Sequence, residues 1–214
     1  MVLDIPVLDI RAGEHVFLVG PSGSGKTSLL NLLGGVAEPE AGSVRLFGTD
    51  LGTLRPAARD ALRADRIGFI FQQFNLLPWL SAIANVTLAC RFSARRREAT
   101  ATEGGPEATA RRLLGDLGLE DVERPAAELS VGQQQRVAAA RALIGGPDLV
   151  IADEPTSALD TANRMRFLDL LSSACRNAGA TLVFVSHDAA LADAFDRTLD
   201  MREINRALPA ETAA

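Results

Sequence analysis

The sequence contains no tyrosine, one tryptophan and only 5% aromatic residues. Its two cysteines, Cys90 and Cys175, lie far apart and match no metal-binding spacing, so we expect reduced, partly buried thiols of a cytosolic protein. No apolar run approaches the roughly 20 residues needed to cross a bilayer, and the N-terminus lacks the pattern of a signal peptide. If the protein works on a membrane, we expect another chain to supply the membrane-spanning part.

Basic residues are in the minority, with 22 lysines and arginines against 27 acidic residues and a net charge of −5. This balance lacks the electrostatic footprint of a protein whose main partner is nucleic acid or anionic lipid, so we expect no nucleic-acid partner. The 47% hydrophobic and 23% charged residues are ordinary globular values and argue against disorder. A length of 214 residues suits one large domain, or a core with a sub-domain.

The segment Gly20-Pro-Ser-Gly-Ser-Gly-Lys-Thr27 fits the phosphate-binding loop pattern G-x-x-x-x-G-K-[ST]. An apolar run at 15–19 precedes it and indicates a buried strand, and residues 27–33 after it indicate a helix that stops at Gly34-Gly35. Glycines let successive N–H groups point at one anion, and the helix N-terminus adds its positive dipole end. The alternative is a glycine-rich turn that binds nothing.

This loop predicts binding of a nucleoside triphosphate. Lys26 supplies a mobile cation for the β- and γ-phosphates, and Thr27 supplies a hydroxyl for Mg²⁺. The residues that we assign to nucleotide binding here are Gly20, Pro21, Ser22, Gly23, Ser24, Gly25, Lys26, Thr27 and Ser28.

Strand and helix patterns alternate along the rest of the chain, which favours a three-layer α/β core with right-handed crossovers. Segments 2–5 and 7–10 alternate roughly as half-exposed edge strands do, and predict an antiparallel β edge at the N-terminus. The other predicted elements are a strand pattern at 43–47, strands at 67–71, 149–152 and 181–185, and helices at 56–65, 161–178 and 189–194.

From about residue 76 to 143 the pattern is helical, which predicts a sub-domain inserted into the core. Ser81 is expected to cap a helix that runs to Phe92, and 108–117 a second helix. Residues 95–106 between them are polar and contain glycine, so we expect a mobile surface loop in which Arg95, Arg96 and Arg97 are solvated. We therefore expect the chain 1–214 to form one domain, with a core of 1–75 and 144–206, a helical part of 76–143 and a frayed tail of 207–214.

Two carboxylates follow the apolar run Leu149-Val-Ile-Ala152. In phosphate-loop enzymes an acid at such a strand end holds the Mg²⁺ shell, and this is the role expected of Asp153. Glu154 beside it could polarise a water toward the γ-phosphate. The alternative, in which the two acids only cap the residues from Thr156 onward, is weaker downstream of a complete phosphate loop.

A second anion-binding site is predicted at Leu129-Ser-Val-Gly-Gln-Gln-Gln-Arg136, where a serine and a glycine open a helix over 133–144. One chain does not need two such sites for one triphosphate. Two chains arranged head to tail do need them, if each lends its serine to the nucleotide of the other.

These residues resemble the ATP-binding subunits of ABC transporters. Leu129-Ser-Val-Gly-Gln133 is similar to the family signature LSGGQ, with Val131 where glycine is usual. The motifs follow in the family's order over nearly the whole chain: Gln72 resembles the Q-loop, Ser157-Ala-Leu-Asp160 the D-loop, and His187 the switch histidine. The resemblance implies a P-loop NTPase core of RecA-like type, with ATP and Mg²⁺ as ligands.

The resemblance also implies a role for each matching residue. Glu154 is expected to be the general base, with Lys26, Gln72 and His187 as the other catalytic groups, and Thr27, Gln72 and Asp153 as the metal shell. Ser130, Gly132 and Gln133 are expected to contact the nucleotide of the second copy, and Asp160 to lie at the dimer seam. A groove near Gln72 is expected to receive a membrane subunit, with Phe74, Leu76, Leu77 and Trp79 either contacting it or packing in the core.

Closer resemblance is to the ATPases that serve lipoprotein release and macrolide export in bacteria, through residues 71–78 and 130–137. That resemblance implies a head-to-tail homodimer at the cytoplasmic face of the inner membrane, bound to an integral permease and driving export or release of a substrate.

Two features depart from the family. The usual adenine-stacking aromatic has no counterpart, because Phe17 belongs to a buried strand by pattern; its absence predicts weaker nucleotide binding, or a true start further upstream. Val131 is expected to crowd the γ-phosphate across the dimer.

Two other functions remain open from the sequence. A soluble ABC-type ATPase acting on nucleic acid or ribosomes is disfavoured by the single cassette, the acidic charge and the absence of a metal or coiled-coil insertion. A non-hydrolysing regulatory subunit is suggested by the missing aromatic and Val131, and opposed by intact Lys26, Asp153, Glu154 and His187.

Overall fold

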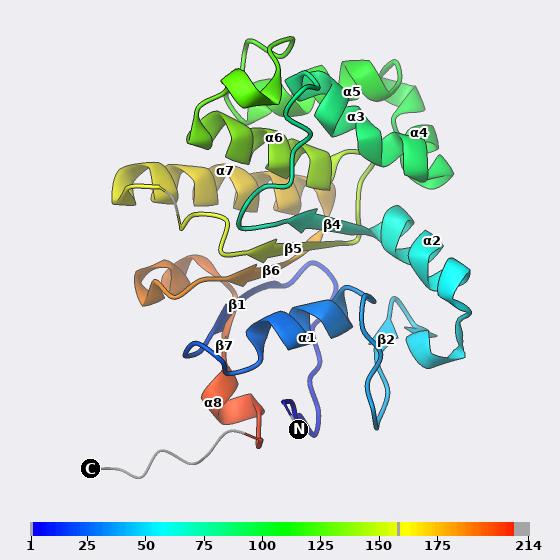
Figure 1. The fold of residues 1–214 in the computed structure, drawn as a ribbon, viewed down its shortest axis with the longest axis vertical. Helices are drawn as coiled ribbons and strands as arrows, with labels where there is room; N and C mark the ends of the chain where they lie inside the picture. The colour runs from blue at the N-terminus through cyan, green and yellow to red at the C-terminus, as the bar shows by residue number, and fades with distance from the viewer. Residues whose placement is uncertain (1, 158, 208–214) are drawn as a thin grey trace.

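A parallel five-stranded sheet runs through the middle of the molecule in the order β4-β5-β6-β1-β7 (Figure 1). The structure is a computed structural model that describes residues 2–157 and 159–207. The strands are β1 His15–Val19, β4 Ile67–Ile70, β5 Leu149–Asp153, β6 Thr181–Val185 and β7 Arg197–Asp200. The first four confirm predicted strands, whereas β7 was not expected.

Near-continuous apolar sequence forms β1, β4, β5 and β6 because helices cover both of their faces. β6 is buried at all five positions, and in β1 the side chains of Val16, Phe17 and Leu18 are at most 1% exposed. Successive side chains point to opposite faces, so Phe17 joins one hydrophobic core while Val16 and Leu18 join the other. The prediction that Phe17 is a core residue is therefore correct.

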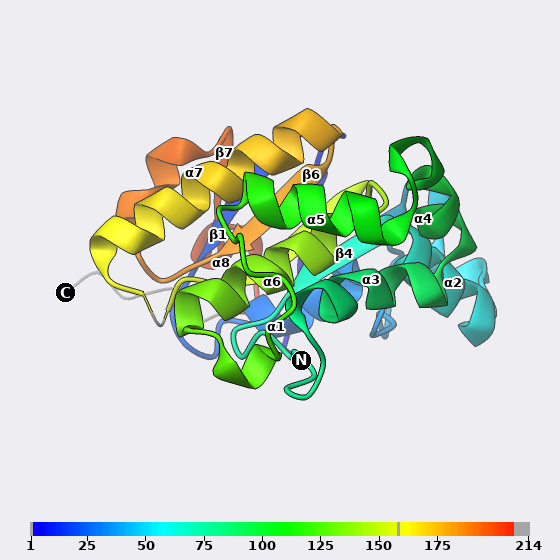
Figure 2. The same ribbon diagram turned by 90° about the horizontal axis from the view of Figure 1, so that it is seen from above.

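Helices form the outer two layers (Figures 1 and 2). α1 Lys26–Leu33 packs on one face, and α6 Val131–Leu143 and α7 Thr161–Ala178 cover the other. The predicted three-layer α/β fold is confirmed, and the predicted helices at 56–65, 82–92, 108–117 and 161–178 are present within about two residues. The remaining helical elements are η1 Leu51–Thr53, α2 Pro56–Arg66, α3 Ala82–Phe92, α4 Ala94–Ala99, η2 Ala101–Glu103, α5 Pro106–Asp116, η3 Ala126–Glu128, η4 Ala189–Ala194 and α8 Met201–Ile204.

No helix in the described part of the chain combines the length and the apolar character that a membrane span requires. Both cysteines are free and buried in the core. Residues 208–214 of the predicted tail, and Ala158 in the predicted D-loop, lie outside the described residues.

The antiparallel β part is a short hairpin of β2 Arg45–Leu46 with β3 Thr49–Asp50. The prediction of N-terminal edge strands at 2–5 and 7–10 is wrong, since both segments are irregular. Their alternating pattern instead reports partly buried side chains, such as Leu3 and Ile5, that pack against the core beside α1. They cannot pair with β1, because β6 and β7 already occupy both of its edges.

The predicted mobile loop at 95–106 is also wrong, because α4, η2 and the start of α5 fill this segment. Arg96 is 2% exposed and donates hydrogen bonds to the carbonyls of Ala142 (3.1 Å), Ile144 (3.0 Å) and Ile67 (2.8 Å). Two of these carbonyls belong to the end of α6, where helical carbonyls lack partners and a cation is favoured. Burial lowers the pKa of Arg96 to about 10, so it stays charged at neutral pH.

The substitution Arg96→Ala is expected to lower the free energy of unfolding by about 2–4 kcal/mol, because it leaves three carbonyls without their donor in a buried place. Urea denaturation measures the loss. Arg91→Ala, at an exposed position of α3, is the control and should change the free energy by less than about 0.5 kcal/mol. Equal stability of the two variants would restore the solvated-loop interpretation.

Candidate functional site

The phosphate-loop sequence joins the end of β1 to the start of α1. Gly23 and Gly25 take positive φ angles of 79° and 95°, the region that favours glycine. The Lys26 ammonium folds back across the loop and donates to the carbonyl oxygens of Gly20 (2.7 Å) and Pro21 (2.9 Å). A phosphate placed in this loop would compete with those carbonyls for the ammonium.

Two of the glycines are also required by close packing around the loop. A Cβ on Gly20 would lie 2.7 Å from Cβ of Met201 in α8, and a Cβ on Gly25 would lie 2.6 Å from Cδ2 of Leu3. Both distances are below ordinary van der Waals contact. The N-terminal segment and α8 therefore pack directly against the loop.

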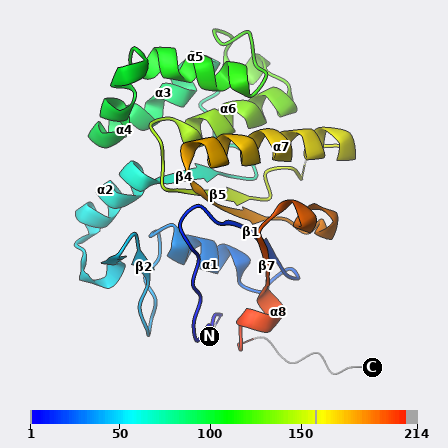
Figure 3. The same ribbon diagram turned by 180° about the vertical axis from the view of Figure 1, so that it is seen from behind.

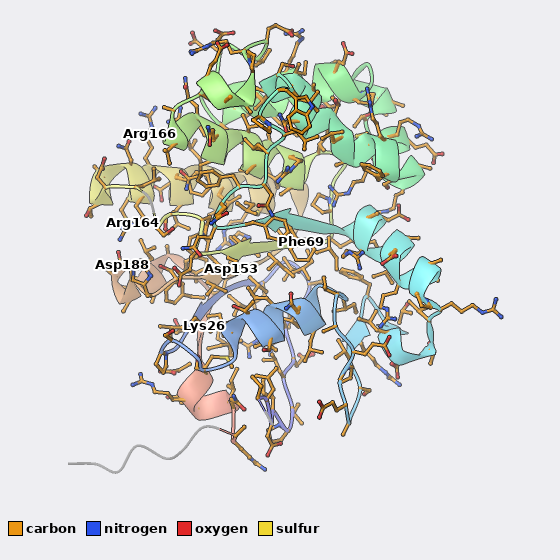
Figure 4. All side chains as sticks on the ribbon, viewed as in Figure 1. Lys26, Phe69, Asp153, Arg164, Arg166 and Asp188 are labelled. Carbon is orange, nitrogen blue, oxygen red and sulfur yellow. The ribbon has the colours of Figure 1, made fainter. Side chains whose placement is uncertain are left out.

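A cavity of about 560 Å³ opens beside the loop where β1, β5, β6 and β7 end. Such convergence is expected, because ligands of parallel sheets bind outside the carboxyl ends of the strands. Figure 4 shows Lys26 and Asp153 on this side of the sheet. The lining residues are Val19, Gly20, Pro21, Ser22, Lys26, Glu154, His187 and Arg202. Sequence analysis missed Arg202, because its place depends on the unpredicted strand β7.

Glu154 and His187 lie next to each other in the cavity lining, with Oε2 of the glutamate 3.4 Å from Nδ1 of the histidine. Glu154 has a φ of 44°, an uncommon value for a non-glycine residue. Its amide donates to the carbonyl of Val185 at 3.0 Å, which ties the residue after β5 to the end of β6. Strained backbone of this kind is tolerated where the surroundings fix it, and it concentrates at functional sites.

Asp153 is half-buried at the end of β5. Burial raises the pKa of its carboxyl group, the charge of Glu154 raises it further, and Lys26 lowers it. The described residues hold no group of three or more His, Cys, Asp or Glu side chains suited to bind a metal ion by themselves. One carboxylate with the exposed Thr27 hydroxyl nevertheless fits Mg²⁺ that is carried in by phosphate oxygens and water.

Gln72 is exposed after β4 and is not among the residues that line the cavity. The turn that follows it is rigid, because Phe74 and Asn75 have φ angles of 58° and 49° and Arg141 of α6 donates to both of their carbonyls at 2.6 Å. The amide of Asn85, which is fully buried, holds the next turn through the backbone of 77–81.

Four apolar residues near Gln72 have different environments. Phe74 is buried in the core, Leu76 and Leu77 are half-buried, and the Trp79 side chain is 71% exposed. The core interpretation therefore holds for Phe74, whereas Trp79 is free to contact another molecule.

Ser130 is the N-cap of α6 and forms a capping box with Gln133. The backbone N–H of Gln133 donates to Oγ of Ser130 at 3.3 Å, and the backbone N–H of Ser130 donates to the side-chain Oε1 of Gln133 at 2.9 Å. Gly132 and Gln133 are half-exposed, and Val131 is 46% exposed. Ser130, Gly132 and Gln133 are not among the residues that line the cavity in the described chain. Asp160 likewise caps α7, accepting from the Asn163 amide at 2.9 Å.

Two buried side-chain amides, which sequence analysis did not assign to the site, connect its loops to other parts of the fold. Gln135 of α6 donates to the carbonyl of Pro155, next to Glu154, at 2.7 Å. Asn205 is 1% exposed and donates to the carbonyls of Ser24 (3.1 Å) and Val2 (3.0 Å), while its Oδ1 accepts from the Asp4 amide at 2.8 Å. Figure 3 shows the N-terminal segment and α8 on the side of the sheet that carries α1. Nothing in the sequence around these amides indicates such long-range contacts.

Comparison with known proteins agrees with this geometry. A sequence model of the family described as "ABC transporter" matches residues 3–157. The macrolide export ATP-binding/permease protein MacB of Rhodopirellula baltica is 42% identical over 206 residues, a match that covers 94% of this chain and 30% of that protein. MacB of Salmonella typhi is 41% identical over 197 residues and is covered to 29%. The chain thus spans less than a third of the length of these relatives.

Solved structures with the same fold include a dimeric post-hydrolysis state of the ATP-binding cassette MJ0796 bound to ADP and Pi. It matches with a TM-score of 0.77 and 36% identity, over 90% of this chain and 83% of that chain. A second dimeric structure of MJ0796, described as a bacterial ABC transporter cassette, matches with the same TM-score of 0.77.

Replacement of Asn205 by alanine is expected to lower the free energy of unfolding by about 2–3 kcal/mol, since several buried backbone groups lose their partner. It should also weaken ATP binding by roughly three- to tenfold, because the Ser24 carbonyl is no longer held. Thermal melting and fluorescent-nucleotide titration measure the two effects, with the exposed Asn177→Ala as the control. Unchanged ATP affinity would mean that Asn205 serves only to hold the N-terminal segment against the C-terminal part of the chain.

Asp153→Asn is expected to stabilise the nucleotide-free protein by about 1 kcal/mol at neutral pH, because it removes a desolvated charge beside Glu154. A raised folded-state pKa means that the wild-type protein loses stability as pH rises through that pKa. The advantage of the variant should therefore grow between about pH 4 and pH 7. Melting temperatures across this range test it, with exposed Asp169→Asn as the control; a pH-independent difference would contradict it.

Proposed function

Because this chain belongs to the ABC transporter family as an ATPase cassette, we propose that two copies of it bind ATP between them and hydrolyse it to drive a membrane subunit. One observation carries the proposal. The cavity brings Lys26, Glu154 and His187 together, whereas the exposed helix start at Ser130 is not part of it. A second copy, placed head to tail, supplies that missing wall.

In this proposal the loop amides and Lys26 bind the phosphates, and Lys26 exchanges the carbonyls of Gly20 and Pro21 for phosphate oxygens. Thr27, Gln72 and Asp153 would hold Mg²⁺, which would supply neutralisation of the charge that develops on the phosphates. Glu154 accepts the proton of the attacking water, and its backbone, tied to β6, fixes the direction of its carboxylate. His187, 3.4 Å from Glu154, contacts the γ-phosphate.

The residues at the start of α6 act on the nucleotide of the other copy. The helix N-terminus presents free N–H groups and a positive dipole end, and Ser130 adds a hydroxyl. The dimeric MJ0796 cassette, to which this chain is similar, supports the arrangement. Asp160 caps α7 at the proposed seam, and Val131 contributes an exposed β-branched side chain there.

We further propose that the membrane subunit is an integral permease and that the cassette works at the cytoplasmic face of the inner membrane. The exposed Trp79, on a turn held rigid by Asn85, is the contact that we assign to it. Similarity to proteins named macrolide export ATP-binding/permease supports export or substrate release as the process that is driven. The 76–143 helical part, which carries both Trp79 and Ser130, then acts as a sub-domain joining permease to nucleotide.

Glu154→Gln tests the central assignment. The variant should bind ATP with an affinity within about threefold of wild type, lose at least about 100-fold in turnover, and form a dimer in the presence of Mg²⁺-ATP. Turnover by phosphate release and mass by light scattering measure these outcomes. Adding Lys26→Ala to the variant is the control, and should abolish the dimer because the triphosphate is no longer held.

The experiment also separates the competing outcomes. Turnover equal to that of the wild type would overturn the general-base role. A Glu154→Gln protein that binds ATP but stays monomeric at every concentration, also with its membrane subunit, would overturn the shared nucleotide. ATP binding without turnover in the wild type, also with its membrane subunit, would indicate a non-hydrolysing regulatory subunit.

A further inference from the structure

Arg164 lies in the first turn of α7, and its guanidinium bridges the turn at Leu159 and the residue that follows His187, a residue of the cavity lining. Nη1 forms an ion pair with Asp188, the residue after His187, and Nη2 donates to the carbonyl of Leu159 at 3.1 Å. The two side chains are 19% and 26% exposed, so solvent screens this pair less than an open surface pair. Figure 4 shows Arg164 and Asp188 beside each other below α7.

Asp188 in turn holds the backbone on both sides of His187. Its Oδ1 accepts from the amide of Ala190 at 3.1 Å, which caps η4, and its own amide donates to Oγ of the buried Ser186 at 3.1 Å. Because Asp188 directly follows His187, we expect a change in the position of its carboxylate to shift the backbone that carries the histidine. Because Nδ1 of His187 lies 3.4 Å from Glu154, that displacement would reach the proposed general base.

Stability alone is a poor explanation for this arrangement. Nε of Arg164 is buried without a hydrogen-bond partner in the described chain, and such an orphaned donor offsets part of what the ion pair contributes. The planar fork of an arginine is nevertheless suited to this place, because its two terminal nitrogens reach different segments at once. A lysine would offer one point of attachment.

We propose that Arg164 is a positioning residue that couples the segment 159–160 to His187. This inference rests on the proposed function, in which that segment lies at the dimer seam and His187 contacts the γ-phosphate. When the second copy displaces Leu159, the guanidinium carries the displacement through Asp188 to His187, and the histidine and Glu154 reach their working geometry only in the closed dimer. Arg164 itself contacts neither ATP nor the attacking water.

The test compares Arg164→Met, Asp188→Asn and the double variant of the full chain, with Arg166→Met as the matched control. Arg166 is an exposed arginine of the same helix and lies on its other side in Figure 4. Asparagine at 188 keeps an oxygen for the Ala190 amide and replaces the oxygen that pairs with Arg164 by an NH₂ group, which cannot accept from the guanidinium. Steady-state ATP hydrolysis, ATP binding and melting temperature are measured for each variant.

We expect kcat to fall on the order of tenfold in Arg164→Met and in Asp188→Asn, while KM for ATP stays within about twofold, because misplacement affects the reacting geometry rather than binding. The double variant should be no slower than the slower single variant, since both substitutions break one interaction. Arg164→Lys should recover part of the lost kcat through the charge pair alone. Arg166→Met should match the wild type.

A fall in kcat that is accompanied by a fall in melting temperature, and that Arg164→Lys does not relieve, would overturn the coupling. So would a double variant whose loss in kcat is the product of the two single losses. If Arg164→Met fails to fold, Asp188→Asn alone still decides, because unchanged kcat in that variant rejects the proposal. Glu154→Gln, measured in parallel, distinguishes a failure of this inference from a failure of the proposed function. If it loses turnover while Arg164→Met and Asp188→Asn do not, the proposed function stands and this inference fails.

Discussion

Parallel pairing of β1 with β6, and of β6 with β5, is the constraint on which the rest of the structure depends. Four residues of β1 pair with β6 and all five residues of β6 pair with β5, so the carboxyl ends of the three strands lie side by side. Three segments far apart in the chain, after Val19, Asp153 and Val185, must therefore meet there. The cavity is a consequence of this alignment, and none of the three loops could form it without the other two.

Buried polar side chains fix the loops that the strands bring together. The backbone of a loop needs partners once it is enclosed, and here single side chains supply them: Asn205 for the phosphate loop, Gln135 for the segment after Asp153, and Arg141 for the turn after Gln72. Each reaches from an element far away in sequence. The loops of the site are consequently held rigid by the layers around them, and Arg164 extends the same principle to the segment after β6 through its ion pair with Asp188.

Most of the fold could be predicted from the sequence, because periodicity reports burial directly. The central strands are apolar throughout, and α7 and β6 have the bounds that the pattern predicted. The failures share one cause. Segments 2–10 alternate because they are half-buried, yet β7 occupies the edge that they would need; residues 94–99 look polar, yet they are helical because Arg96 finds carbonyls at the end of α6. A hydrophobic pattern in the sequence indicates how deeply a residue is buried, but it does not indicate which element that residue contacts.

The sequence by itself determined the candidate residues of the site. The loop with Lys26, the paired acids Asp153 and Glu154, His187, and the helix start at Ser130 are local motifs, and their residue types predict the proposed chemistry. Only the tertiary structure decided which of them meet. It joins Lys26, Glu154 and His187 in one cavity and keeps Ser130 and Gln72 apart from its lining. It also adds Arg202, Asn205 and Arg164 to the surroundings of the site, because contacts between distant elements depend on strand order and packing, which short motifs do not encode.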